Sequence, residues 1–201
     1  MSSSSNKMLM IFLKNSGREN AIFQSDATIE DKITSRLHKE LMESALTTTR
    51  NLECDKAVFY SDYLEYEDAW KLAKYQQHLQ RGLNFGEKVE NAFLLAFKKG
   101  YEKVILIGSE SYSISSEIIT EAFNTLDVND VVIGPANNGG YYLLGMKKVH
   151  PELFHGKAWD EENILLDTII DMQKLGLSYH LLETKESVIE TKMTEKQANP
   201  L

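Results

Sequence analysis

The chain has 201 residues, of which 42% are hydrophobic and 26% are charged, a composition typical of one globular domain with a sizeable core. Its formal net charge of -8 disfavours extended contact with nucleic acid, because such contact needs clustered Lys and Arg. The single Cys54 excludes an internal disulfide, and the first apolar run, residues 8–13, is too short for a signal-peptide core or a membrane span. We expect one cytoplasmic domain over residues 1–186 and a polar tail over residues 187–201.

Short apolar runs alternate with helical patterns along the chain, which predicts a layered α/β domain with a largely parallel sheet. A helix is expected to begin near Thr28, with apolar residues at four-residue spacing as far as Ala45. The cleanest amphipathic pattern begins at Asn84 and is closed by Gly100. Three further helices are expected over residues 66–74, 115–126 and 162–175. The predicted strands are residues 8–14, 56–61, 75–79, 103–108, 130–134, 140–146 and 179–184.

The stretch from Val131 to Met146 joins two apolar runs through the polar sequence Asn137, Asn138, Gly139, Gly140. Glycine permits positive φ and close backbone approach, so the turn could offer amide groups to a bound molecule such as a nucleotide sugar. Asn and Gly between strands are also the strongest short-range signal for an ordinary β-hairpin. The turn alone favours the hairpin, and only its neighbours in the sequence favour a binding site.

Ligands of open parallel sheets bind outside the carboxyl ends of the strands, so the loops after the predicted strands are the candidates for a site. Glu110 follows the buried strand 103–108 and could hold Mg²⁺ or Mn²⁺ on a diphosphate, since these cations prefer hard oxygen ligands. A solvated Glu near the start of the next helix is an equally good interpretation. The segment that contains Gln80 and Gly82 runs into a helix N-terminus, a natural anion site, although capping by Asn84 explains the same residues.

Taken together, these motifs resemble the small bacterial GT-A-like transferases, a largely uncharacterised family related to the nucleotide-diphospho-sugar transferases. The resemblance runs from Met8 to about Thr184 and implies a three-layer α/β/α sandwich with a Rossmann-like, mostly parallel mixed sheet. It implies a nucleotide site in the N-terminal half and an acceptor site in the C-terminal half. Five segments carry it in order: MLMIFLKN, QRGLNFGEKVENAF, VILIGSES, GPANNGGYYLLGM and LFHGKAW.

The chain departs from the family pattern at residues that are expected to take part in the chemistry. Relatives carry a Gly-x-x-Lys-Thr-Arg-Leu segment after the first strand, and the corresponding stretch here, residues 33–37 (ITSRL), keeps the arginine as Arg36 but not the lysine. Arg36 could still contact a phosphate with its fork of donors. Relatives have aspartates where this chain has Glu110 and Asn138. Because one ligand is longer and the other is neutral, we expect weaker metal binding than in those relatives.

Two hypotheses follow from the resemblance. In the first, the protein is a glycosyltransferase that binds a nucleotide-diphospho-sugar with Mg²⁺ or Mn²⁺ and transfers the sugar to an unknown acceptor. In the second, it is a catalytically degenerate relative that acts as a nucleotide-binding or assembly module without turnover. Neither involves nucleic acid or a membrane span, and a homodimer is open in both.

The first hypothesis assigns roles to individual residues. Glu110 holds the cation, and Asp160 or Glu161 supplies the missing carboxylate as base or ligand. The substrate-binding residues are predicted to be Arg36, Gln80, Gly82, Asn137, Asn138, Gly139, Gly140 and Trp159.

Overall fold

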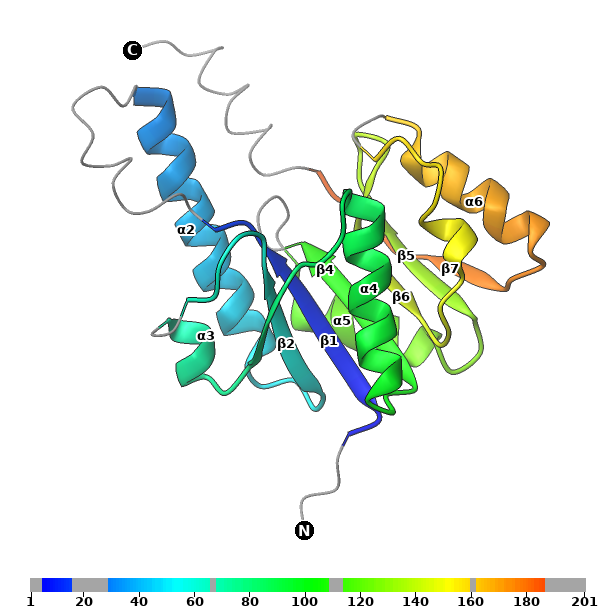
Figure 1. The fold of residues 1–201 in the computed structure, drawn as a ribbon, viewed down its shortest axis with the longest axis horizontal. Coiled ribbons are helices and arrows are strands. Elements are labelled where there is room, and N and C mark those ends of the chain that lie inside the picture. Colours follow the sequence, from blue (N-terminus) through cyan, green and yellow to red (C-terminus); the bar gives the residue numbers. More distant parts are fainter. Residues whose placement is uncertain (1–4, 16–28, 66–67, 109–113, 160–161, 187–201) are drawn as a thin grey trace.

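The computed structural model describes residues 5–15, 29–65, 68–108, 114–159 and 162–186, and these residues form a mixed seven-stranded sheet with helices on both faces (Figure 1). The strand order is β3-β2-β1-β4-β6-β5-β7. The strands are β1 (Lys7–Leu13), β2 (Asp55–Tyr60), β3 (Gln76–Leu79), β4 (Lys103–Gly108), β5 (Val131–Pro135), β6 (Tyr141–Met146) and β7 (Tyr179–Leu181). The helices are α2 (Ile29–Thr49), α3 (Ala69–Leu72), α4 (Phe85–Lys98), α5 (Ser116–Thr125), α6 (Ile164–Lys174) and the short 3₁₀ helix η1 (Pro151–Leu153).

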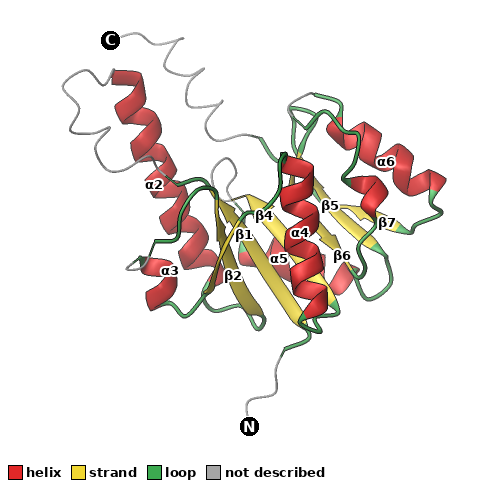
Figure 2. Ribbon diagram, viewed as in Figure 1, coloured by secondary structure: helices red, strands yellow, loops and turns green. Residues whose placement is uncertain are grey.

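The sheet is the middle of three layers, because its central strands are buried on both faces (Figure 2). On one face, Met10 and Leu106 pack against Phe93 of α4, and the same core extends to Met172 of α6. On the other face, side chains of β1, β4 and β6 pack against α5, and the helices α2 and α3 complete this layer. Continuous apolar runs such as KVILIG suit strands covered on both sides. The predicted α/β/α sandwich is therefore confirmed.

Most predicted elements are present with shifts of one or two residues at their ends. Asn84 is the N-cap of α4, and its side chain accepts a hydrogen bond from Glu87 N, as the sequence predicted. In α2, the predicted apolar stripe is confirmed at Leu41 and Ala45, which face the core, whereas its earlier side chains, as far as Leu37, lie outside the described residues.

Three features differ from the sequence prediction. The helix expected over residues 66–74 is shorter, covering only Ala69–Leu72. The last strand is also shorter, because regular pairing with β5 ends at Leu181 and gives way to one isolated bridge between Ala136 and Lys185. The 3₁₀ helix was not predicted. No helix in the described part of the chain is both long and apolar enough to cross a membrane.

Candidate functional site

The carboxyl ends of six strands, all except β6, meet at one edge of the sheet. The strand β1 pairs in parallel with β2 and β4, and β2 pairs in parallel with β3. Because β6 is antiparallel to both β4 and β5, the strand β5 also ends at this edge, and so the β5–β6 turn lies there. We call this edge the rim. It is where the sequence predicted that the polar loops would gather.

A cavity of about 420 Å³ opens at the rim, within the size range of small-molecule sites. It has two sides of different chemistry. Polar side chains come from the ends of β1, β2 and β3, and apolar side chains come from α4 and from the sheet beneath it. The lining residues are Phe12, Leu13, Lys14, Ser61, Gln80, Phe85, Val89, Leu106, Gly108, Tyr141, Tyr142, Leu143 and Leu144.

On the polar side, Asn15 fastens the end of β1 to the loop after β2. Its side chain is 9% exposed, and its amide nitrogen donates to Tyr63 O at 2.9 Å while its oxygen accepts from Asp62 N at 2.8 Å. Asn15 N donates to Ser61 Oγ at 2.9 Å, and Ser61 Oγ in turn donates to Asp62 Oδ2 at 2.5 Å. These bonds fix the backbone around Ser61, which lines the cavity.

Gln80 connects the ends of β1 and β2. Its amide nitrogen Nε2 donates to Leu13 O and to Phe59 O, each at 3.0 Å. Both partners are carbonyl acceptors, so the nitrogen must face them and the orientation of the amide is settled by chemistry. The carbonyl oxygen Oε1 takes part in neither bond, and it is the acceptor that Gln80 can offer to a ligand.

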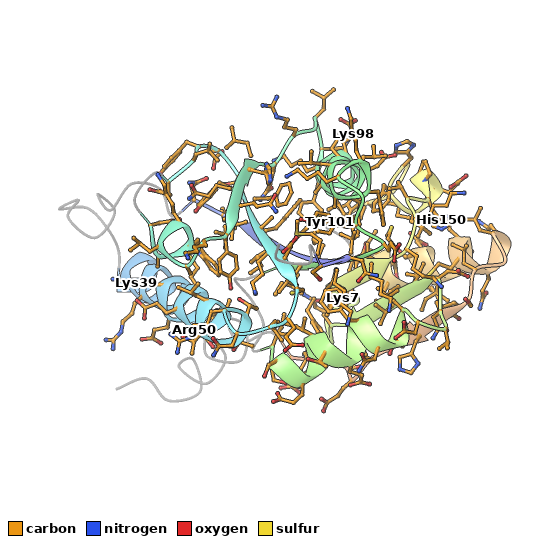
Figure 3. The ribbon with its side chains drawn as sticks, turned by 90° about the horizontal axis from the view of Figure 1, so that it is seen from below. Lys7, Lys39, Arg50, Lys98, Tyr101 and His150 are labelled. Atoms are coloured by element: carbon orange, nitrogen blue, oxygen red, sulfur yellow. The ribbon has the colours of Figure 1, made fainter. Side chains whose placement is uncertain are left out.

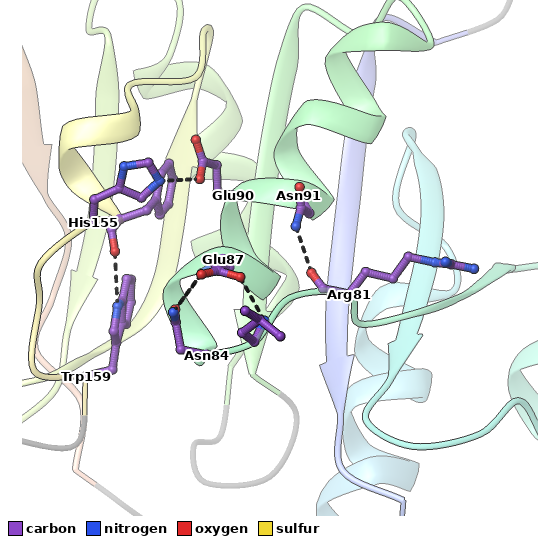
Figure 4. Close-up of polar contacts among 9 residues, drawn as sticks. Arg81, Asn84, Glu87, Glu90, Asn91, His155 and Trp159 are labelled. Carbon is purple, nitrogen blue, oxygen red and sulfur yellow. Dashed lines mark hydrogen bonds and ion pairs between the residues drawn. The ribbon is translucent and has the colours of Figure 1, made fainter.

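On the apolar side, Phe85 stands between the cavity and a cluster of aromatic rings. It contacts Phe12 edge-on at 6.1 Å and Trp159 at 5.3 Å between ring centroids. Trp159 stacks on Phe154 at 6.5 Å and donates from Nε1 to Phe154 O at 3.3 Å (Figure 4). Phe85 is nevertheless 46% exposed, so a large aromatic surface remains open beside the cavity.

Tyr141 brings a buried hydroxyl to the same side. Burial raises the pKa of Tyr141 far above its ordinary value, and an interaction with Thr168 acts weakly in the opposite direction. The Tyr141 hydroxyl has no partner of good hydrogen-bond geometry within the described residues. The nearby Thr168 hydroxyl donates to Ile164 O at 2.8 Å. Tyr141 therefore stays neutral at physiological pH and can act only as a neutral donor or acceptor.

The β5–β6 turn is a hairpin turn whose amides are already used within the protein. Asn137 N donates to Lys185 O at 3.0 Å, Gly139 N to Ala136 O at 3.2 Å, and Gly140 N to Asn138 Oδ1 at 3.2 Å. Gly139 has φ +81°, and a Cβ there would lie 1.7 Å from Glu162 O. The glycine is thus required for close approach to the chain segment that leads into α6, and the predicted presentation of these N–H groups to a ligand is not observed.

The N-terminus of α4 is likewise occupied by the protein's own carboxylate. Glu87 accepts from Leu83 N at 2.8 Å and from the Asn84 side chain at 2.9 Å (Figure 4). Gly82 packs against the same turn, since a Cβ there would lie 2.6 Å from Lys88 N. Capping therefore explains this segment, as the alternative interpretation of the sequence had it, and the helix end is not open to an anion.

Other predicted residues lie elsewhere or outside the described residues. Arg36 is exposed on α2 and forms an ion pair with Glu40 at 3.0 Å, and it does not line the cavity. In Figure 1 the first turns of α2 project past the rim. The predicted carboxylates Glu110, Asp160 and Glu161 lie outside the described residues.

The described lining of the cavity contains no carboxylate, and the described residues include no group of three or more His, Cys, Asp or Glu that could hold a metal ion. The described lining by itself therefore does not fit Mg²⁺ or Mn²⁺. A second hollow, of about 600 Å³, runs along the exposed side of α5. Because one helix forms it alone, it is a surface depression without convergent groups.

A polar network around Tyr101 closes the opposite end of the sheet, and Figure 3 shows this end with Tyr101 labelled. There the Tyr101 hydroxyl donates to Asp55 Oδ2 at 2.7 Å and accepts from Gln76 Nε2 at 3.2 Å, and Lys99 donates to Gln76 Oε1 at 2.6 Å. Burial and the bond to Asp55 raise the pKa of Tyr101. The polar groups of these side chains are thus hydrogen-bonded to one another.

Sequence reasoning missed Asn15, Ser61 and Phe85 as residues of the site. Ser61 could have been found, because it is the last residue of the predicted strand 56–61 and so lies at the carboxyl end where ligands bind. Phe85 belongs to the amphipathic pattern that begins at Asn84, and only the packing of α4 across the sheet shows that its ring borders a cavity. The bonds of Asn15 join residues 46 to 48 positions apart, which no local pattern predicts.

Comparisons with known proteins agree with this architecture. A nucleotide-diphospho-sugar transferase described as putative, from Desulfovibrio desulfuricans, is similar in structure, with a TM-score of 0.78, 24% identity, and coverage of 98% of this chain and 89% of that chain. Glucosyl-3-phosphoglycerate synthase from Mycobacterium tuberculosis, solved with Mn²⁺, UDP and glucosyl-3-phosphoglycerate, gives a TM-score of 0.54, 11% identity, and coverage of 90% and 70%. A CMP:2-keto-3-deoxy-manno-octonic acid synthetase in complex with CTP gives 0.50, 9% identity, and coverage of 99% and 100%.

At these identities the structural matches establish the fold alone. No curated protein matches the chain in sequence. The family described as uncharacterized protein conserved in bacteria, DUF2064, matches residues 44–161, which is more than half of the chain. The expected resemblance to a small bacterial transferase-like family is confirmed, and the chain belongs to the DUF2064 family.

Proposed function

We propose that the protein is a transferase that binds a nucleotide-diphospho-sugar in the rim cavity and passes the sugar to an acceptor. One observation carries this proposal: the cavity lies where β1, β2, β3 and β4 end, the place where open α/β sheets bind their ligands. The fold supports it by analogy, because solved proteins of the same fold hold UDP or CTP.

The charge of the rim suggests where the anionic diphosphate would lie. Lys14 lines the cavity, and the exposed Arg81 follows Gln80 along the loop. Figure 4 shows the Arg81 side chain extending away from α4. Lysine and arginine side chains carry the N–H donors that suit a phosphate. The diphosphate would therefore bind on the polar side, near the ends of β1 and β3.

In the proposed reaction, an acceptor oxygen forms a bond to the anomeric carbon as the bond from that carbon to the diphosphate breaks. The bonding electron pair leaves with the nucleoside diphosphate, and the acceptor proton passes to a base, for which Asp160 or Glu161 is proposed. A divalent cation would stabilise the charge that develops on the leaving group. Glu110, which follows the cavity residue Gly108 by two positions, is the proposed ligand for that cation.

One observation favours the alternative, a nucleotide-binding module without turnover. Asn138 occupies the place of an aspartate in the family pattern, and its amide oxygen accepts a hydrogen bond from Gly140 N within its own turn. A neutral amide in this arrangement cannot serve as a base, and it contributes no charge to a cation site.

Calorimetric titration of the full chain with UDP- and GDP-sugars, with and without Mn²⁺, separates the two functions. Binding that Mn²⁺ strengthens and that Glu110→Ala abolishes supports the metal-assisted transferase. The control is Glu43→Ala, an exposed carboxylate on α2, which should leave binding unchanged. Binding without a metal effect supports the module, and absence of binding by every nucleotide sugar contradicts both.

A further inference from the structure

The two sides of the rim cavity differ in charge as well as in polarity. Within the described lining, the side formed by α4 carries no cationic residue, and the charged side chains on the first turns of that helix, Glu87, Lys88 and Glu90, do not line the cavity. Glu87 caps the helix, and Glu90 pairs with His155 at 2.7 Å (Figure 4). An anionic group placed here would meet no cationic side chain of the described lining and no open helix N-terminus.

The lining of this side is apolar and preformed. Phe12, Leu106 and Leu144 project from the sheet, and Phe85 and Val89 project from α4. Apart from Phe85, these side chains are at least nine-tenths buried, so the floor is fixed by the core of the protein. Phe85 is the exception, because its ring is 46% exposed at the mouth while two neighbouring rings hold it on edge.

We propose that the α4 side of the cavity binds a neutral aromatic or alicyclic body belonging to the acceptor, and that the acceptor hydroxyl points toward the polar side. This inference rests on the proposed function for the identity of the second ligand, and it departs from the family resemblance by placing acceptor contacts on Phe12 and Phe85 of the N-terminal half. A nucleobase is a poorer occupant of this side, because its edges need hydrogen-bond partners and the polar side-chain atom that the described lining brings here, the Tyr141 hydroxyl, is buried. Ring-on-ring contact with Phe85 would remove apolar surface from water.

The structure supplies its own reporter for such binding. The described residues contain two tryptophans: Trp159 contacts Phe85 and Tyr141 at the cavity, and Trp70 is buried on the opposite face beside Tyr75. In a Trp70→Phe background, the emission reports on Trp159. The probe is fluorobenzyl alcohol, a neutral aromatic alcohol whose own fluorine signal in NMR provides a second measurement of binding.

The matched variants are Phe85→Ala and Leu94→Ala. Both residues lie on α4 and both are 46% exposed, but only Phe85 lines the cavity. We expect saturable binding of the alcohol to the parent protein, weakened about tenfold in Phe85→Ala and by less than about twofold in Leu94→Ala, in line with the loss of one ring contact. Circular dichroism spectra of the variants detect any misfolding. The variant Phe85→Leu keeps an apolar side chain and separates loss of the ring from loss of packing.

The decisive comparison is between binding of the alcohol to the free protein and its binding in the presence of saturating UDP-glucose and Mn²⁺. The proposal requires that the alcohol still binds when nucleotide sugar is present. Absence of saturable binding, equal weakening in the two alanine variants, or displacement of the alcohol by UDP-glucose overturns it. These outcomes are distinct from failure of the proposed function, because that failure would appear in the calorimetric titration with nucleotide sugars alone.

Discussion

The β5–β6 turn and the ends of β1, β2 and β3 have similar sequences, with polar and glycine residues after apolar runs, but the structure uses them differently. In the turn, three backbone amides bond within the protein and Gly139 lies against Glu162 O. At the ends of the three strands, the side chains of Asn15 and Gln80 donate hydrogen bonds to backbone carbonyls, and a cavity remains open beside them. The comparison teaches that a glycine-rich turn can serve packing as readily as ligand binding.

The largest expected effect distinguishes the two glycines of the turn. Gly139→Ala should destabilise the protein by about 3 kcal/mol, because the new Cβ would collide with Glu162 O and the φ is positive. Gly140→Ala is the control, since its Cβ would first meet the movable Asn138 side chain at 3.3 Å, and it should cost less than about 1 kcal/mol. Urea denaturation measures both. Equal losses would show that the turn does not depend on this close approach.

The next effect concerns the ion pair that holds α6 to the loop before Trp159. Lys157 is 3% exposed and pairs with Asp171 at 2.7 Å, so Asp171→Asn should cost about 2 kcal/mol by leaving a buried ammonium without its partner. The value is below that of a fully buried pair, because Asp171 is 26% exposed. Lys174→Ala removes only an exposed partner of Asp171 and should cost less than about 0.5 kcal/mol.

The same pair predicts a dependence of stability on pH. Hydrogen bonds from Lys157 and Lys174 hold the pKa of Asp171 below its ordinary value. A carboxyl whose folded-state pKa is depressed contributes stability above its unfolded pKa and loses it as the pH falls through the folded value. The parent protein should therefore lose stability below about pH 4, and Asp171→Asn should show a flatter acid limb. Parallel acid limbs in the two proteins would contradict this assignment.

A smaller effect is expected at the strand ends. Gln80→Ala leaves the carbonyls of Leu13 and Phe59 without their donor and should cost about 1 to 2 kcal/mol. Asn91→Ala, which removes one exposed bond to Arg81 O on the same loop, should cost less than half as much. If Gln80→Ala is as stable as the parent in thermal unfolding, the two strands are not joined by this amide.

The sequence predicted the fold well because strands and helices leave periodic patterns, and α4 shows this best through its cap at Asn84 and its buried stripe. It predicted the location of the site only as far as strand order allows. Tertiary packing places Gly139 against Glu162, and no local pattern in the sequence predicts this contact. The same holds for Arg36, which points to solvent and pairs with Glu40. The assignments of Glu110, Asp160 and Glu161 remain predictions, since these residues lie outside the described part of the chain.

The central claim, that the rim cavity is the ligand site, is tested most directly at Gly108. This glycine lines the cavity, and a Cβ built there meets no described atom within 4 Å, so Gly108→Leu should fold normally and fill the space. In calorimetric titrations with nucleotide sugars, we expect Gly108→Leu to bind at least about tenfold more weakly than the parent protein at an unchanged melting temperature. Equal affinity in the two proteins would contradict the claim.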